Sequence, residues 1–194
     1  MTTPPPVADP VRAHQARRTL ILIAAAVIAP VALSYYFYYF SPRAAFTNYG
    51  ELLPTVPLPE LVGTTLEGQP FRTAELRGKW TILVPAGGAC DADCVDALYA
   101  TRQARTMQGK DMDRVVRAWI VSDDAVPPPE RLAGHPDVVV ARLPAAEVAK
   151  LPKAGNALLL VDPLGNPVLA WPRQPDAKAL AKDLGRLLKA SRIG

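Results

Sequence analysis

The sequence predicts an α/β domain, with helices on both faces of a central sheet, that follows one N-terminal transmembrane helix. Three observations support this prediction. An uncharged run of 21 residues lies near the N-terminus, at residues 20–40. After it, short apolar runs alternate with segments of helical periodicity. The only two cysteines, Cys90 and Cys94, directly follow one of those apolar runs, where a strand is expected to lead into a helix.

The uncharged run is long enough to cross a bilayer as a helix, since 21 residues span roughly 30 Å. Arg12, Arg17 and Arg18 precede it, whereas only Arg43 follows closely. Positive charge collects on the cytoplasmic side, and the aromatic run 35–40 is typical of the opposite interface. We therefore expect a single-pass protein of the bacterial inner membrane, with its N-terminus in the cytoplasm and its soluble domain in the periplasm.

A cleaved signal peptide is the alternative interpretation, because Ala32-Leu33-Ser34 has the pattern of a cleavage site. Six aromatic residues after that site make more sense at a membrane interface than at a mature N-terminus. Proline clusters mark the tail and the segment after the anchor. The expected segments are a disordered cytoplasmic tail (1–18), a transmembrane helix (19–40), a proline-containing spacer (41–59) and a folded α/β domain (60–194).

The charge of the folded part is nearly balanced. Without the three arginines and the one aspartate before residue 41, the chain has 19 Lys and Arg against 17 Asp and Glu. It has no basic patch interleaved with aromatic residues, so we expect no binding to nucleic acid.

The elements of the domain are expected in the order β-α-β-α-β-α-β-β-α, after a hairpin at 64–71 and a helical turn at 73–76. The expected strands are 80–85, 115–121, 138–142, 157–161 and 168–171. The expected helices are 90–108, 129–133, 145–151 and 176–190. This order predicts a largely parallel sheet with an antiparallel hairpin at its edge. With the cysteines at the first strand-to-helix junction, it is a thioredoxin-like three-layer α/β/α layout.

The spacing of Cys90 and Cys94 suits thiol chemistry. Residues four apart lie on one face of a helix, and a helix N-terminus favours thiolates. Such a pair can form a reversible disulfide or bind a soft metal ion. Asp91, Asp93 and Asp96 should disfavour thiolates by like-charge repulsion, which predicts a reducing or slow pair rather than a strong oxidant.

Four blocks of sequence resemble the SCO proteins, which are membrane-anchored, thioredoxin-fold copper chaperones of cytochrome c oxidase assembly. The blocks are L-E-G-Q-P-F at 66–71, E-L-R-G-K-W at 75–80, C-x-x-x-C at 90–94 and L-L-V-D-P-L-G at 159–165. The resemblance covers roughly residues 60–190 and places the anchor where the family has it. It implies that Cys90 and Cys94 are the catalytic thiols and the copper ligands.

The chain departs from the SCO pattern in two places. The family has a proline after each cysteine, but Asp91 and Val95 stand there. The family's third copper ligand is a histidine shortly before the hairpin strand, and the corresponding stretch, 153–156, has no histidine. His135 precedes a parallel strand, so we expect it at the pole of the sheet opposite the cysteines. The implied Cu(I) site therefore has two ligands and lacks the third.

We therefore expect a factor for cytochrome c oxidase assembly that acts through thiol–disulfide exchange or Cu(I) delivery. Its expected partners are the inner membrane and either an oxidase copper-site subunit or another redox protein. Two alternatives stay open: a general periplasmic thiol-disulfide oxidoreductase, and a binding scaffold in which the cysteines form only a structural disulfide. A disulfide that closes so short a loop adds little stability, which mildly favours a functional role.

Overall fold

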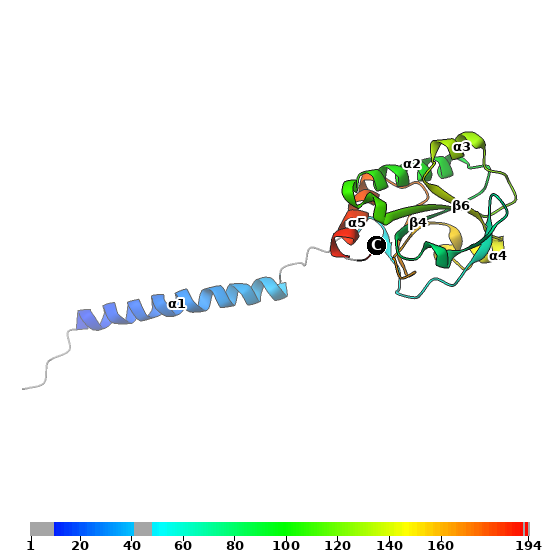
Figure 1. The fold of residues 1–194 in the computed structure, drawn as a ribbon. Helices are drawn as coiled ribbons and strands as arrows, with labels where there is room; N and C mark the ends of the chain where they lie inside the picture. Colours follow the sequence, from blue (N-terminus) through cyan, green and yellow to red (C-terminus); the bar gives the residue numbers. More distant parts are fainter. Residues whose placement is uncertain (1–9, 41–47, 192, 194) are drawn as a thin grey trace, which may run out of the picture. The chain divides into compact units, whose positions relative to one another are not determined.

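The structure is a computed structural model that describes residues 10–40, 48–191 and 193. The chain divides into two units, residues 1–47 and 48–194. The described part of the first unit is a single helix, α1 (Pro10–Phe40), and the second unit contains the sheet and all the other helices (Figure 1). The predicted tail and spacer fall in part on residues 1–9 and 41–47, which lie outside the described residues.

Helix α1 begins earlier than the sequence predicted. Residues 10–18 were expected to be disordered, but the helix includes them. Alanine, arginine and glutamine favour helices, and a proline suits the first helical position, where its missing N–H needs no partner. Of the described helices, only this one has a stretch, Arg17–Phe40, that is long and apolar enough to cross a membrane.

The second unit contains eight strands, four α-helices and three short 3-10 turns in its described residues. The strands are β1 (Glu51–Leu52), β2 (Val62–Thr65), β3 (Pro70–Arg72), β4 (Trp80–Ala86), β5 (Val115–Val121), β6 (Val138–Arg142), β7 (Leu158–Val161) and β8 (Pro167–Trp171). The helices are α2 (Ala92–Thr106), α3 (Pro129–Gly134), α4 (Ala145–Val148) and α5 (Ala177–Ala190). The 3-10 turns are η1 (Thr73–Leu76), η2 (Gly109–Arg114) and η3 (Pro152–Gly155).

The eight strands form one mixed sheet in the order β1-β8-β7-β4-β5-β6-β2-β3. Only β4, β5 and β6 pair in parallel, with Trp80 opposite Val115 and Arg117 opposite Val138. All the other neighbouring strands are antiparallel. The expectation of a largely parallel sheet was therefore wrong. Hairpins flank the parallel centre on both sides, since β7 pairs directly with β4 and the β2–β3 hairpin extends the sheet from β6.

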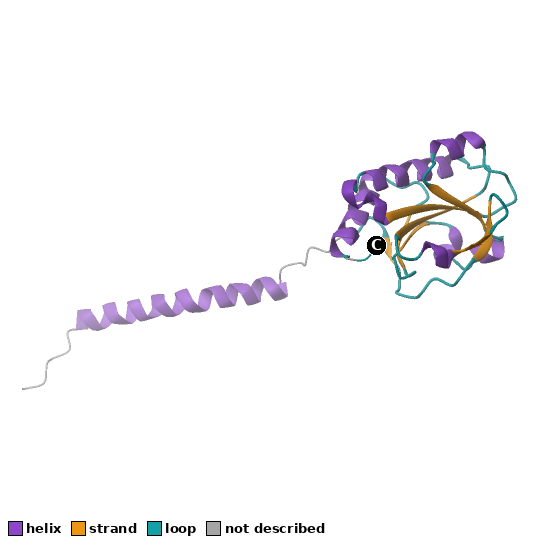
Figure 2. Ribbon diagram, viewed as in Figure 1, coloured by secondary structure: helices purple, strands orange, loops and turns teal. Residues whose placement is uncertain are grey.

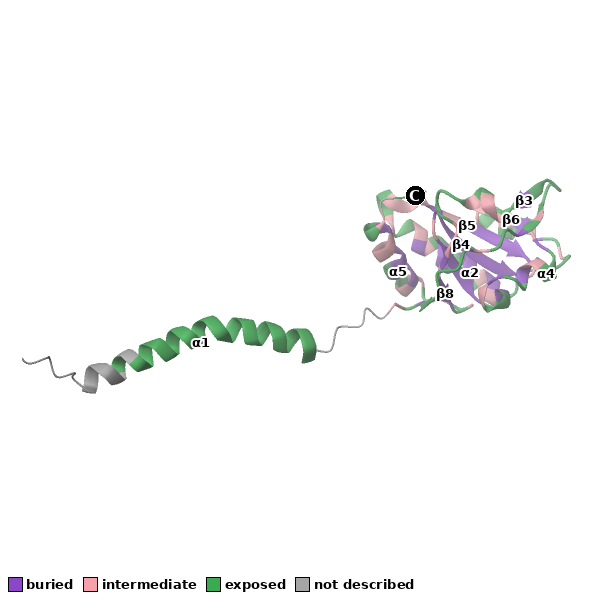
Figure 3. Cartoon of the chain, turned by 90° about the horizontal axis from the view of Figure 1, so that it is seen from below, coloured by how far each residue is buried: buried purple, intermediate pink, exposed green. Residues whose placement is uncertain are grey.

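Two apolar cores lie on the two faces of the sheet, as a three-layer α/β/α fold requires (Figure 2). Alternate residues of β4 point to opposite faces, so Ile82 and Val84 belong to one core and Leu83 to the other. Helices α2 and α5 pack on the first face, whereas α4 covers the second. Figure 3 shows the central strands buried beneath these layers. The cysteines belong to the core beneath α2 and α5.

The segment 48–59, expected as part of a spacer, is folded against the domain. Its strand β1 pairs with β8, and Leu53 and Leu58 pack on the second core. Gly50 makes this possible because a Cβ at this position would lie 2.6 Å from the Trp171 indole nitrogen. The prolines of this segment suggested a spacer. Leu53 and Leu58 alone gave too little indication that the segment packs on the domain.

Candidate functional site

Cys90 and Cys94 lie together just after the carboxyl end of β4 and form a disulfide, with their Cα atoms 5.1 Å apart. The prediction that both lie on one helical face was wrong. Helix α2 begins only at Ala92, so Cys90 lies in the loop before it, with a left-handed φ of 54°. Asp91 explains this start, because its carboxylate accepts a hydrogen bond from the Cys94 N–H at 2.9 Å and thereby caps the helix.

The two cysteines differ slightly in exposure. Cys90 is 6% exposed and Cys94 only 1%. Cys90 therefore retains slightly more contact with solvent, whereas Cys94 is enclosed by the core. Both residues nevertheless belong to the buried core.

The loop that carries Cys90 is held against the loop after β5. Asp123 accepts a hydrogen bond from the Gly88 N–H at 2.8 Å, and the Cys90 N–H donates to the Gly87 carbonyl at 3.1 Å. Gly88 has to be a glycine, since a Cβ there would come 2.0 Å from the Ala125 carbonyl oxygen. Asp123 was not predicted as a site residue, although its place at the end of a parallel strand could have indicated it.

An arginine from a distant segment lies beside the acidic residues of the site. Arg173, just after β8, approaches Asp93 at 3.5 Å and Asp91 at 3.8 Å, and Gln174 donates to Asp93 at 2.7 Å. The expected like-charge repulsion between these carboxylates and the thiolates is therefore partly offset by a cation. Arg173 was missed because only the antiparallel return of β8 brings it to this pole. Asp96 is exposed on the same helix.

A pocket of about 340 Å³ opens next to the cysteine loop. Gly87, Ser122, Asn156 and Arg173 are among the residues that line it. Its opposite wall is the loop 153–155, in which three consecutive residues have left-handed φ values of 58°, 49° and 72°. This is the stretch in which the resemblance implied a histidine, and its side chains provide no soft metal donor.

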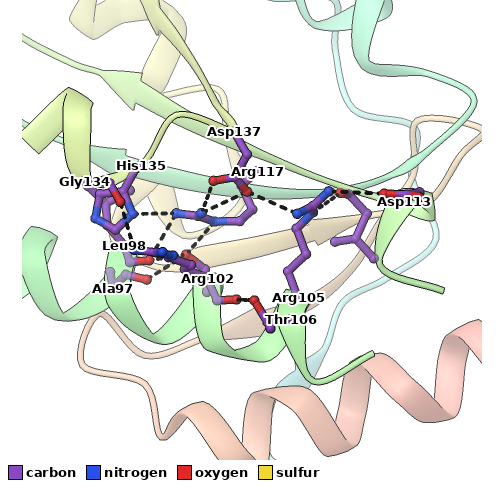
Figure 4. A network of polar contacts seen from close by, with 12 residues as sticks. Ala97, Leu98, Arg102, Arg105, Thr106, Asp113, Arg117, Gly134, His135 and Asp137 are labelled. Carbon is purple, nitrogen blue, oxygen red and sulfur yellow. Dashed lines mark hydrogen bonds and ion pairs between the residues drawn. The ribbon is translucent and has the colours of Figure 1, made fainter. Parts of the chain in front are cut away.

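His135 lies at the other pole of the sheet, as predicted. It ends α3, before the start of β6, and its Nδ1 is 3.3 Å from the Arg117 guanidinium (Figure 4). Burial, together with the charge of Arg117, lowers the pKa of His135 below its usual value. His135 therefore belongs to a polar cluster of its own and cannot complete a metal site with the cysteines.

The residues near the cysteines make a poor copper site on their own. Reduction of the disulfide would free two thiolates, which are the soft ligands that Cu(I) prefers. Their polar neighbours, Asp91, Asp93 and Arg173, are two hard carboxylates and a cation. No group of three or more His, Cys, Asp and Glu residues suited to a metal ion occurs in the described part of the chain. Two thiols can exchange disulfides without a further donor, whereas a Cu(I) ion held by them would find no third soft ligand among these neighbours.

Solved structures of thioredoxin-like proteins share this fold. ScoI of Bradyrhizobium japonicum with copper bound is 20% identical, with a TM-score of 0.54 over 68% of this chain and 99% of that one. Yeast Sco1 with copper bound is 20% identical, with a TM-score of 0.61 over 72% and 96%. A thiol:disulfide interchange protein from Bacteroides sp. is 14% identical, with a TM-score of 0.54 over 73% and 93%. No curated protein matches the sequence.

Residues 80–191, more than half of the chain, match the model of one protein family. Its description is transmembrane-like, thioredoxin-like, C-terminal domain. The match begins at β4 and ends just after α5, so it spans the cysteine pair and the central strands. The chain therefore belongs to the family of transmembrane-like, thioredoxin-like C-terminal domains.

Proposed function

We propose that this protein is a membrane-anchored, periplasmic factor that acts on a copper-site client during cytochrome c oxidase assembly. Its thioredoxin-like domain would act through thiol–disulfide exchange at Cys90 and Cys94. The observation that supports this best is the disulfide itself, which joins the end of the central strand β4 to the first turn of α2. The likeness to Sco proteins solved with copper bound supports a copper-site client.

The proposed exchange begins with the reduced protein. The Cys90 thiolate attacks one sulfur of a client disulfide, so a mixed disulfide forms and the client's other sulfur leaves as a thiolate that takes up a proton. The Cys94 thiolate then attacks the Cys90 sulfur. The client leaves as a dithiol, and Cys90 and Cys94 are oxidised to the disulfide. A cellular dithiol reductant would regenerate the reduced pair.

Copper would be the cargo of this protein rather than a resident cofactor. Two thiolates could hold Cu(I) briefly, with a third ligand contributed by the client. The neighbouring carboxylates argue against stable storage, since Cu(I) prefers soft ligands. Exchange is therefore the primary activity in this proposal, and Cu(I) delivery through the same thiols is the secondary one.

A Cu(I) titration of the full-length protein in detergent separates these activities. With both thiols reduced, we expect weak binding of one Cu(I), and no binding after the thiols are alkylated. His135→Gln is the matched control, because His135 lies at the opposite pole and its loss should leave Cu(I) binding unchanged. Tight binding that survives alkylation would contradict this assignment of the ligands.

A strain that carries Cys90→Ser and Cys94→Ser tests the cellular role. We expect lower cytochrome oxidase activity and an oxidase deficient in copper, with the variant still present in the membrane at normal abundance. Normal oxidase activity in that strain would overturn the proposed client.

A general thiol-disulfide oxidoreductase is the second candidate. The likeness to a thiol:disulfide interchange protein supports it. Rapid reduction of small disulfides and of unrelated proteins would favour this candidate, whereas a preference for a copper-site dithiol would favour the first.

A further inference from the structure

A stripe of four basic residues runs along α5, and we call it the α5 basic stripe. It consists of Lys178, Lys182, Arg186 and Lys189, spaced by four, four and three residues. This spacing places all four on one face of the helix. The three lysines are exposed, and the Arg186 side chain is 38% exposed.

The charge of the stripe is largely uncompensated. Among the described residues, no hydrogen bond or ion pair involves the side chain of Lys178, Lys182 or Lys189. Arg186 lies 3.8 Å from Asp183, which is buried at the flank of the stripe. Two other lysines of the domain are paired, Lys150 with Glu147 and Lys153 with Glu51. The stripe therefore presents positive charge to a ligand outside the molecule.

The groove beside the stripe adds an apolar group to this surface. It lies between α5 and the end of α2, and Met107, with 56% of its surface exposed, is one of its lining residues. The acidic residue in the groove, Asp111, is paired with Arg114 at 3.2 Å. The surface thus combines free cations with one exposed thioether and lacks the aromatic residues that stack on nucleic-acid bases.

The chain from the anchor reaches the domain on this same helix. The Tyr49 and Gly50 N–H groups donate to the Asp183 carboxylate of α5 at 3.2 and 2.8 Å, and the Trp171 indole donates to it at 3.1 Å. Only seven residues, 41–47, separate the end of α1 from Asn48. An extended chain of this length covers less than about 30 Å. If α1 spans a bilayer, this short connection tethers the domain covalently to that membrane.

We propose that the α5 basic stripe docks the domain on anionic lipid headgroups of the membrane that holds α1. A lysine near an anionic surface strengthens binding by about fivefold. Three unpaired lysines on a short tether are therefore sufficient to favour one orientation of the domain. This inference rests on the proposed membrane anchoring but not on the proposed thiol chemistry.

Lysine acetylation of the full-length protein in lipid nanodiscs tests the inference. One set of discs contains only phosphatidylcholine, and the other also contains phosphatidylglycerol. We expect Lys178, Lys182 and Lys189 to react at least threefold more slowly in the anionic discs, and the protection to vanish in high salt. Lys79, which is exposed on another part of the domain, is the internal control and should react equally in both.

A variant series uses Met107 as the reporter. Spin-labelled lipid should broaden the Met107 methyl resonance in anionic discs, and Lys178→Gln/Lys182→Gln/Lys189→Gln should reverse most of that broadening. Arg77→Gln/Lys79→Gln/Arg131→Gln removes the same charge from exposed positions outside the stripe and should leave the broadening intact.

Equal acetylation in neutral and anionic discs would overturn the inference, as would protection that appears only when an acidic protein is added to neutral discs. Failure of the protein to remain in discs after a high-salt wash would instead refute the membrane anchor. That wash is therefore done first, so the two failures can be told apart.

Discussion

Two polar clusters at opposite poles of the sheet differ in burial and in the lengths of their contacts. At the strand-starting pole, Arg117 is fully buried and lies 3.0 Å from Asp137, with further hydrogen bonds to Thr101 and the Leu98 carbonyl of α2. At the cysteine pole, Arg173 is partly exposed and stays 3.5 to 3.8 Å from its two carboxylates.

The difference separates a structural cluster from an adjustable one. Short, buried contacts tie β5 to α2, and breaking them would leave a charge in the core. Longer, solvated contacts stabilise the fold little but can still alter the electrostatics of nearby sulfurs. The charge of Arg117 should therefore mainly affect the stability of the fold, and the charge of Arg173 should mainly affect the reactivity of the cysteines.

The largest expected effect is on stability, from Arg117→Ala. This change removes the hydrogen bonds to Thr101 and the Leu98 carbonyl, leaves Asp137 with only Arg105 as an ion-pair partner, and empties a buried volume. We therefore expect a loss of about 2–5 kcal/mol. Chemical unfolding of the full-length protein in detergent, followed by tryptophan fluorescence, measures it. A loss of stability below about 1 kcal/mol would contradict the structural role assigned to the Arg117–Asp137 pair.

The next effect is the removal of the disulfide. Cys90 and Cys94 are four residues apart, and closing so short a loop stabilises a fold by only about 2 kcal/mol. We therefore expect Cys90→Ser/Cys94→Ser to unfold at moderately lower denaturant while keeping its circular dichroism spectrum. Complete loss of folding would instead indicate that the disulfide has a mainly structural role.

Acid should weaken the Arg117 cluster in two steps. The pKa of His135 is lowered by burial and by Arg117, so the unfolded chain takes up a proton first and stability falls as pH drops below about 6.5. Burial raises the pKa of Asp137, but the charges of Arg117 and Arg105 and the hydrogen bonds to its carboxylate together lower it. Its contribution to stability is therefore lost below about pH 4. We expect the first step to be under about 1 kcal/mol, since His135 is partly solvated. Unfolding at pH 7 and pH 5 should differ less in His135→Gln than in the wild type.

The smallest effect on stability should come from Arg173→Gln, for which we expect less than about 0.5 kcal/mol. Its effect should appear in reactivity, because Asp91 and Asp93 would then repel the thiolates without compensation. We expect slower alkylation of Cys90 and a more negative reduction potential.

A double-mutant comparison tests whether Arg173→Gln acts on the reactivity of Cys90 through the two carboxylates. In an Asp91→Asn/Asp93→Asn background, in which asparagine can still cap α2, Arg173→Gln should change the alkylation rate little. Arg72→Gln, which breaks an exposed pair with Glu60 at 3.2 Å, is the matched control and should leave the rate unchanged. An equal effect of Arg173→Gln in both backgrounds would exclude the carboxylates as the cause.

Local patterns predicted most elements of the domain but fewer of the contacts at its site. The apolar runs of β4 and β5 and the amphipathic period of α5 are strong signals, and these elements lie where they were expected. The mixed pairing of the sheet was missed because strand direction depends on how β7 returns beside β4. Gly50, Asp123 and Arg173 were missed for the same reason, since each acts through a partner more than 30 residues away.

The start of α2 shows a local competition that periodicity alone cannot resolve. The i, i+4 spacing predicted that Cys90 lies inside the helix. Aspartate is more favourable at the N-cap than inside a helix, so Asp91 caps α2 and the helix begins at Ala92. The two cysteines therefore lie together, as the spacing predicted, but they do not share one helical face.

The most direct test of the central claim is a redox titration of Cys90 and Cys94 in the full-length protein, with folding followed in the same samples. We expect both sulfurs to be reduced reversibly while the fold is retained. The expected potential lies between about −180 and −300 mV, well below the −120 mV or so of a strong periplasmic oxidant. Sulfurs that become reducible only when the domain unfolds would contradict the assignment of this pair as an exchange site.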